Sequence, residues 1–115
     1  MIKIPFPPSA NNYWRHGKGR TFLTKEAQEY RDMIGYTINA IETTEPIEVE
    51  LAFYPKNSRR WDLDNRIKQL LDALQHAGVF KDDAQVQKLT ARKMPKQEDE
   101  YCELTIRTTG GNDVL

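Results

Sequence analysis

Cysteine is almost absent from this chain, which has a single thiol, Cys102, among 115 residues. A lone cysteine cannot form a disulfide within the chain, and the lack of a Cys/His cluster argues against a zinc site. No apolar run approaches the roughly 18 residues of a membrane-spanning helix. The opening letters, MIKIPFPPSA, also lack the basic-then-apolar layout of a secretory signal. We therefore expect a cytoplasmic protein that does not enter a membrane.

Net charge is missing as well, because 17 Lys and Arg residues balance 17 Asp and Glu residues. This balance excludes binding to a polyanion through bulk charge, so any contact with nucleic acid must come from local patches. Two such patches exist. One acid-free basic group spans residues 15–20, and the other comprises Lys56, Arg59 and Arg60.

Length and periodicity predict one α+β domain over residues 1–115. Alternating apolar residues predict strands at 2–6, 47–53, 84–93 and 101–107. Apolar residues at steps of three and four predict two helices, one capped by Thr24 and reaching Ile41, the other running from about Asp64 to Gly78. Residues 7–23 read as a long loop, extended only at 21–23, and the closing GGNDVL is expected to fray. The order β-α-β-α-β-β predicts a mixed sheet with two main helices on it.

Two acidic residues precede the second predicted helix. If the chain is still extended there, Asp62 and Asp64 point to one side and Leu63 to the other. Paired carboxylates repel each other unless a cation lies between them, and Mg²⁺ and Mn²⁺ prefer such hard oxygen ligands. Lys68 lies one helical turn after Asp64, where it can pair with the carboxylates or stabilise charge on a phosphate. The segment therefore predicts a divalent-cation site.

Simpler explanations compete with this one. A lone Asp64 would ordinarily be a helix N-cap, although Asp62 lies too early to cap the same amides. Asp82 and Asp83 follow the helix in a turn, where aspartate is common for conformational reasons. The helix separates the two pairs by about 20 Å. Either the chain returns to complete one site or a second subunit supplies the missing carboxylate, and the sequence leaves both possibilities open.

The loop after the first strand mixes amides, aromatic rings and cations, a combination that binds phosphates and stacks on unpaired bases. The candidate DNA-contacting residues of this loop and of the segment before Asp62 are Asn12, Tyr13, Arg15, His16, Lys18, Arg20, Arg59 and Arg60. The alternative is a solvated loop whose aromatics fold back onto the core. Trp61 is predicted to pack against the second helix rather than to wedge into DNA. Asp72, four residues after Lys68, is placed to draw that lysine into an intrahelical salt bridge.

Three segments together resemble the RusA-type Holliday junction resolvases: PFPPSANNYWRHGKGRTFLT, WDLDNRIKQLLDALQHAGVFKDDAQV and ARKMPK. The resemblance covers nearly the whole chain. It implies a RusA-like homodimer that uses Mg²⁺, or Mn²⁺ in its place, and no organic cofactor. Such an enzyme resolves four-way DNA junctions by paired symmetric nicks, in recombination and repair, and the family is common in phage-derived DNA.

The same resemblance assigns roles to individual residues. It makes Asp62, Asp64 and Asp83 the essential metal-binding acids, Asp82 an additional acidic position, and Lys68 the functional lysine. One departure is Trp61, because the family tends to place a basic residue immediately before the first aspartate.

Two other functions remain compatible with the residues. The chain could be a non-catalytic junction-binding or recombination-regulating module with a structural metal, or a Mg²⁺-dependent nuclease acting on RNA or simple duplexes. The intact acidic set and Lys68 favour an enzyme over the first alternative. Only the resemblance argues against the second.

Overall fold

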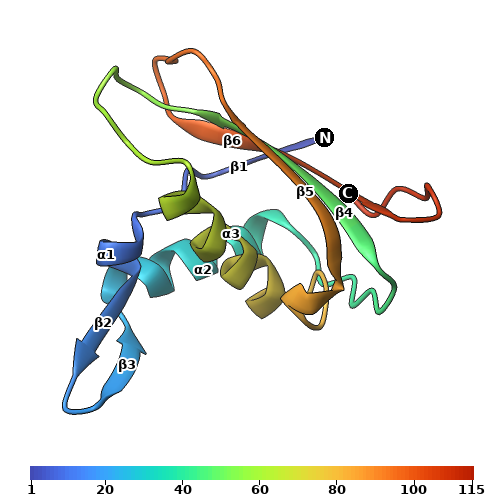
Figure 1. The fold of residues 1–115 in the computed structure, drawn as a ribbon, viewed down its shortest axis with the longest axis horizontal. Coiled ribbons are helices and arrows are strands. Elements are labelled where there is room, and N and C mark those ends of the chain that lie inside the picture. Colours follow the sequence, from blue (N-terminus) through green and yellow to red (C-terminus); the bar gives the residue numbers. More distant parts are fainter.

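A mixed four-stranded sheet with helices on one face forms the body of the computed structural model, which describes residues 1–115 (Figure 1). The strands lie in the order β1-β6-β4-β5. Their bounds are Ile2–Ile4 for β1, Ile47–Tyr54 for β4, Val86–Lys93 for β5 and Tyr101–Thr108 for β6. β6 is antiparallel to both neighbours, whereas β4 and β5 are parallel and are connected through α3, Asp64–His76.

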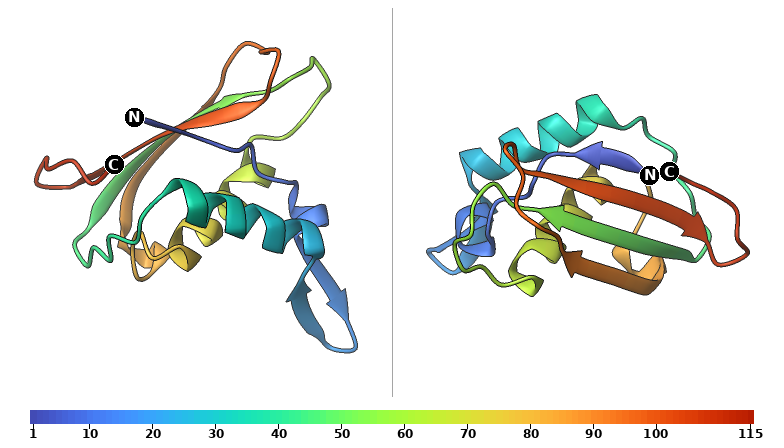
Figure 2. Two further views of the ribbon diagram at one scale, coloured as in Figure 1. Left: turned by 180° about the vertical axis from the view of Figure 1, so that it is seen from behind. Right: turned by 90° about the horizontal axis from the view of Figure 1, so that it is seen from above.

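The hydrophobic core lies between this sheet and the two longer helices, α2 (Lys25–Thr37) and α3 (Figure 2). Alternate residues of β4 and β6 are buried, as strands with one covered face require. α3 contributes the buried Leu70 and Leu74. The predicted α+β domain, its four sheet strands and its two main helices are therefore confirmed. None of the helices is long and apolar enough to cross a membrane.

The predicted loop at 7–23 is wrong, because this region contains a short helix and a hairpin. α1 spans Ala10–Tyr13, β2 spans Trp14–Gly17 and β3 spans Arg20–Leu23. Lys18 and Gly19 close the hairpin with positive φ angles of 50° and 75°. Two-residue hairpin turns favour such angles, because they match the twist of the paired strands. The hairpin projects from the body of the protein (Figure 2).

The end of α2 and the C-terminal tail also differ from expectation. Thr24 caps α2 by accepting a hydrogen bond from the Ala27 amide, as predicted, but the helix ends at Thr37 rather than reaching Ile41. The Ile41 and Glu42 amides instead donate to the Gly78 carbonyl at 3.0 and 2.7 Å. The C-terminal tail does not fray in this structure, since the amides of residues 114 and 115 both donate to the Ile106 carbonyl.

The N-terminal segment is tied to the first turns of α3 by three side chains. Asn65 Oδ1 accepts a 2.7 Å hydrogen bond from the Ala10 amide, and so caps α1 from across the fold. Arg66 donates to the Pro7 carbonyl at 2.8 Å, and the buried Gln69 donates to the Pro8 carbonyl at 3.0 Å. The residues that follow Asp64 therefore determine where α1 and the hairpin lie.

Replacing Asn65 with alanine should lower the free energy of unfolding by about 1–2 kcal/mol, as loss of a helix cap does. Urea unfolding would measure this. Asn57→Ala is the matched control, because Asn57 caps only the exposed Arg59 amide, and it should change stability by less than about 0.5 kcal/mol. Equal effects of the two variants would contradict the anchoring of α1 by Asn65.

Candidate active site

The first acidic pair lies at the start of α3. Asp62 and Asp64 are exposed, while Leu63 between them is turned inward and packs against the core. The geometry differs from the prediction, because Leu63 is helical (φ −61°, ψ −46°) rather than extended. Asp64 is the first residue of the helix and not its N-cap, and no side chain caps α3. Neither carboxylate forms an ion pair. Asp64 lies in the first helical turn, where the helix dipole favours negative charge, whereas Asp62 precedes the helix.

Lys68 is exposed on the same helix and is not paired with Asp72, so the predicted intrahelical salt bridge is wrong. Asp72 Oδ2 instead lies 2.9 Å from Arg31 Nη2 of α2 and accepts a 2.5 Å hydrogen bond from the Tyr13 hydroxyl. This is the only ion pair in the chain. Lys68 therefore remains free to meet a charged ligand.

The second acidic pair lies in the turn beyond α3, where the short 3-10 helix η1 spans Asp83–Gln85. Asp82 caps this helix by accepting a hydrogen bond from the Ala84 amide at 2.9 Å. The Asp83 amide donates to Gln75 Oε1 at 3.1 Å, which ties the turn to the last part of α3. The Asp83 side chain is exposed and has no such capping role. Of the two, Asp83 is the carboxylate available to a ligand.

The first acidic pair lies at the start of α3 and the second in the turn that follows its end, so the two lie at opposite ends of this helix. A helix of 13 residues is about 20 Å long at the usual rise. In keeping with this separation, no group of three or more Asp, Glu, His or Cys side chains is close enough to hold a metal ion together. One chain thus carries two separate acidic pairs rather than one acidic cluster.

The predicted basic surface belongs to the projecting hairpin. Its exposed basic side chains are Arg15, His16, Lys18 and Arg20, with Asn12 exposed on the adjoining α1. Open hollows of about 400 and 410 Å³ flank Arg15. The prediction that Tyr13 contacts DNA is wrong, because its ring is fully buried. Arg59 and Arg60 are exposed in the loop that leads to Asp62.

Trp61 packs into the protein, as predicted, but not against the expected partner. Its ring contacts Phe6 and Phe53, with centroid separations of 5.4 and 5.8 Å. Lys93 of β5 donates to the Trp61 carbonyl, and its Nζ lies 4.6 Å from the centroid of the indole. A positive charge from a distant strand therefore lies beside the residue that precedes Asp62.

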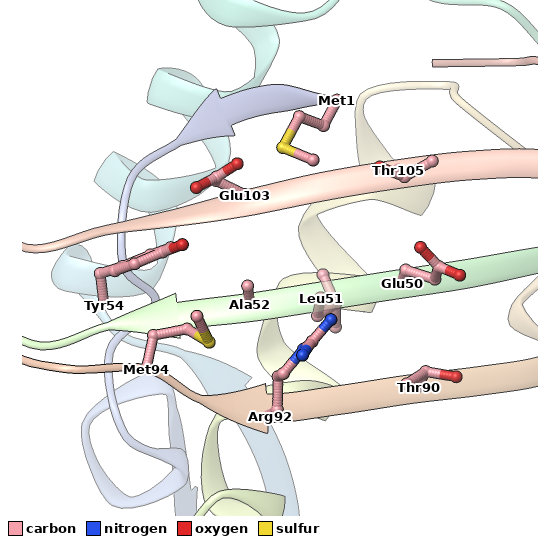
Figure 3. A pocket seen from close by; sticks show the side chains of 10 residues that line it. All are labelled: Met1, Glu50, Leu51, Ala52, Tyr54, Thr90, Arg92, Met94, Glu103 and Thr105. Carbon is pink, nitrogen blue, oxygen red and sulfur yellow. The ribbon is translucent and has the colours of Figure 1, made fainter.

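Another hollow, of about 200 Å³, lies across the sheet strands and is shown in Figure 3. Its lining combines apolar, aromatic and charged side chains, among them Met1, Tyr54, Arg92, Met94 and Glu103. Its lining includes none of the acidic or hairpin residues considered above. This hollow is therefore separate from the candidate site.

Two contacts with the site could not be predicted from the sequence. Lys93 reaches Trp61, and Trp14 lies under the Lys68 ammonium at 5.3 Å from Nζ to the ring centroid. Both contacts join segments distant in the chain, so no local spacing could reveal them. The only local signal was the presence of Trp14 among cations, which is ambiguous between packing and binding.

The family model for "Endodeoxyribonuclease RusA" matches residues 5–107 of the chain. The chain belongs to the RusA endodeoxyribonuclease family. It is 42% identical over 113 residues to the crossover junction endodeoxyribonuclease RusA of Escherichia coli (strain K12). It is 40% identical over 113 residues to the crossover junction endodeoxyribonuclease of Enterobacteria phage 82. Each alignment covers 95% of this chain and 94% of the relative.

The RusA match includes every candidate residue, from α1 and the hairpin to η1. The match therefore covers both acidic pairs and the basic hairpin. Tyr13 connects these parts in the present structure, because it precedes the hairpin and its hydroxyl reaches Asp72 of α3.

Burial, together with the hydrogen bond to Asp72, raises the pKa of Tyr13 above its ordinary value of 10.0. Above about pH 10 the unfolded chain loses this proton first, so the free energy of unfolding falls as pH rises. Burial also raises the pKa of Tyr30 and Cys102, so only a comparison of variants isolates Tyr13. We expect Tyr13→Phe to make the fall shallower than in the wild type.

Urea unfolding at about pH 8 and about pH 10.5 would measure this difference. Tyr36→Phe is the control, because Tyr36 is 89% exposed and its hydroxyl should not change the pH dependence. Parallel pH dependence in Tyr13→Phe and the wild type would contradict the proposed contribution of Tyr13.

Proposed function

We propose that this RusA family member is a Mg²⁺-dependent endonuclease that resolves four-way DNA junctions by paired symmetric nicks. Acting on cellular or phage DNA in the cytoplasm, it would serve recombination and repair. The observation that carries the proposal is the state of the acidic residues. Asp62, Asp64 and Asp83 are exposed and form no ion pair, although the chain contains 17 basic residues. The names of the relatives, crossover junction endodeoxyribonucleases, support the choice of substrate.

The donor set suits Mg²⁺, which prefers a few carboxylate oxygens and keeps several waters. Because the two acidic pairs lie at opposite ends of α3, we expect that one chain does not supply all three carboxylates to one ion. A second chain can, if a twofold axis crosses the middle of α3. That symmetry would bring Asp62 and Asp64 of one chain close to Asp83 of the partner, and would do so twice. The homodimer would thus hold two composite metal sites.

The edge of the sheet offers room for such a partner. β5 is an edge strand in which every residue except Val86 and Ala91 is exposed. Leu89 is 41% exposed, although it pairs with the buried Val49 and therefore belongs to the side of the sheet that α3 covers. Exposed strand edges with apolar residues are templates for pairing with another chain. This surface favours a dimer formed near α3 and β5.

Each group of side chains then has a task in phosphodiester hydrolysis. Mg²⁺, when bound, supplies Lewis acidity that activates water and neutralises charge on the phosphate. Lys68 would stabilise the negative charge that develops on the phosphate. Arg59, Arg60 and the hairpin cations would hold the DNA backbone, because charged hydrogen bonds to phosphate are strong and directional. The free carboxylates favour this enzyme over a module that only binds DNA.

Substrate choice can be tested with three labelled nucleic acids: a synthetic four-way junction, a matched duplex and an RNA hairpin. We expect Mg²⁺-dependent cutting of the junction at symmetric positions, little cutting of the other two, and none with a chelator. Failure to cut the junction at any Mg²⁺ concentration would overturn the proposal. Equal cutting of the duplex or the hairpin would replace it with a less selective nuclease.

Asp64→Asn should reduce junction cutting by more than about 100-fold, which exceeds the usual cost of losing an outer-shell partner of a metal ligand. Junction binding should survive, because the basic hairpin is unchanged. Rates and gel-shift affinities would be compared with those of Asp32→Asn, an exposed aspartate on α2 that should behave like the wild type. Simultaneous loss of binding and cutting would assign Asp64 a structural role.

Composite sites predict that two inactive variants restore each other. In a mixed dimer of Asp64→Asn and Asp83→Asn chains, one site carries both substitutions and the other carries neither. Random mixing should therefore restore roughly a quarter of the wild-type number of sites, each nicking a single strand. No recovery in a mixture shown to contain mixed dimers would place the acids of each site in one chain.

A further inference from the structure

The Lys68 ammonium has an aromatic partner and no acidic one. Its Nζ lies 5.3 Å from the centroid of the Trp14 ring. A cation within about 6 Å of an aromatic centroid is attracted to the face of the ring. Asp64 and Asp72 lie four residues to either side on the same helix, yet neither pairs with the lysine. The contact with Trp14 is therefore the interaction that defines where the ammonium lies.

Asp72 is bonded to Tyr13 and Arg31 rather than to Lys68. Oδ2 accepts the Tyr13 hydroxyl at 2.5 Å and Arg31 Nε and Nη2 at 3.1 and 2.9 Å. Each charged hydrogen bond of this kind is stronger than a neutral one. These bonds hold Asp72 toward Tyr13 and Arg31, and no ion pair joins it to Lys68.

Trp14 is itself held in place. Its ring packs edge to face against Tyr13, with centroids 4.7 Å apart and planes at 73°. Tyr13 is fully buried and hydrogen-bonded to Asp72. As the first residue of β2, Trp14 is also paired with Leu23 in the hairpin ladder. The indole is therefore a fixed surface beside α3, and Asp72 supports it through Tyr13.

We propose that Trp14 is a positioning residue that holds the charged Lys68 side chain ready for the scissile phosphate. This proposal rests on the catalytic role of Lys68 proposed above. An ion pair with Asp64 or Asp72 would have to break before the lysine could bind phosphate. A cation resting on an aromatic face keeps its charge and some of its hydration, so less is lost when the phosphate arrives. Trp14 also connects the lysine to the hairpin that would hold the DNA.

A double-mutant cycle separates positioning of Lys68 from a direct role of Trp14. Under single-turnover conditions with Mg²⁺, Trp14→Leu should slow junction cutting about two- to fivefold, the factor that an exposed cation–π contact implies. Trp14→Phe, which keeps an aromatic face, should lose less. In a Lys68→Ala background, Trp14→Leu should cause no further loss. An equal loss in both backgrounds would overturn the proposal.

The matched control removes a similar contact elsewhere. Lys3 Nζ lies 4.4 Å from the centroid of Tyr101. These residues belong to β1 and β6, the two strands farthest from β5 in the sheet. Tyr101→Leu should leave the cutting rate unchanged. If it slows cutting as much as Trp14→Leu does, general destabilisation would account for both effects.

The contact can also be observed without metal or DNA. Protons on the Lys68 ε-carbon should resonate upfield in NMR spectra because they lie over the indole ring, and Trp14→Leu should abolish that shift while Tyr101→Leu preserves it. An unshifted Lys68 signal in the wild type would overturn the proposal even if Lys68→Ala cuts too slowly for the cycle. A shifted signal in a protein that cuts no junction would instead refute the proposed function and leave the contact intact.

Discussion

The fold depends on the hydrogen bonds that tie residues 7–10 to the first turns of α3. Two prolines in this segment leave it with few amides, and the carbonyls of Pro7 and Pro8 need donors. Arg66 and Gln69 supply them, while Asn65 accepts from Ala10. These three side chains lie in the first turns of α3, shortly after Asp64. The same part of the helix therefore carries an acidic residue and holds the segment that leads into the basic hairpin. The position of the basic hairpin relative to Asp64 is thus determined by the first turns of α3.

The second general feature is the scarcity of ion pairs. In a chain with equal numbers of acids and bases, only Arg31 and Asp72 pair, and they do so between α2 and α3. Surface pairs contribute little to stability, so their absence costs the fold little. It leaves the carboxylates at both ends of α3 and the cations of the hairpin with their charges uncompensated by neighbours, which suits a surface that meets metal ions and phosphates.

Sequence alone predicted the parts of the structure that follow from local periodicity. The alternation in β4 and β6 and the apolar stripe of α3 each reflect one buried face, and they gave correct elements. The parts that failed depend on distant contacts. α1 is capped by Asn65, and the end of α2 is set by Gly78, so neither boundary is visible in its own neighbourhood. The acidic residues were found from their spacing, although the extended geometry assumed for Leu63 was wrong. Burial of Tyr13 agrees with the alternative in which the loop aromatics fold back onto the core, but its partner Asp72 could not be predicted, because it lies on another helix.

The placement of acidic residues at the two ends of one rigid helix would also limit unwanted cutting of DNA in the cell. A helix cannot shorten to bring its ends together, so an isolated chain cannot assemble the proposed metal site. Below the dissociation constant of a homodimer, the amount of dimer falls with the square of the chain concentration. Activity would then depend on the concentration of the protein. At low concentration the chain would not cut the genome, and cutting would begin only when the chain is abundant.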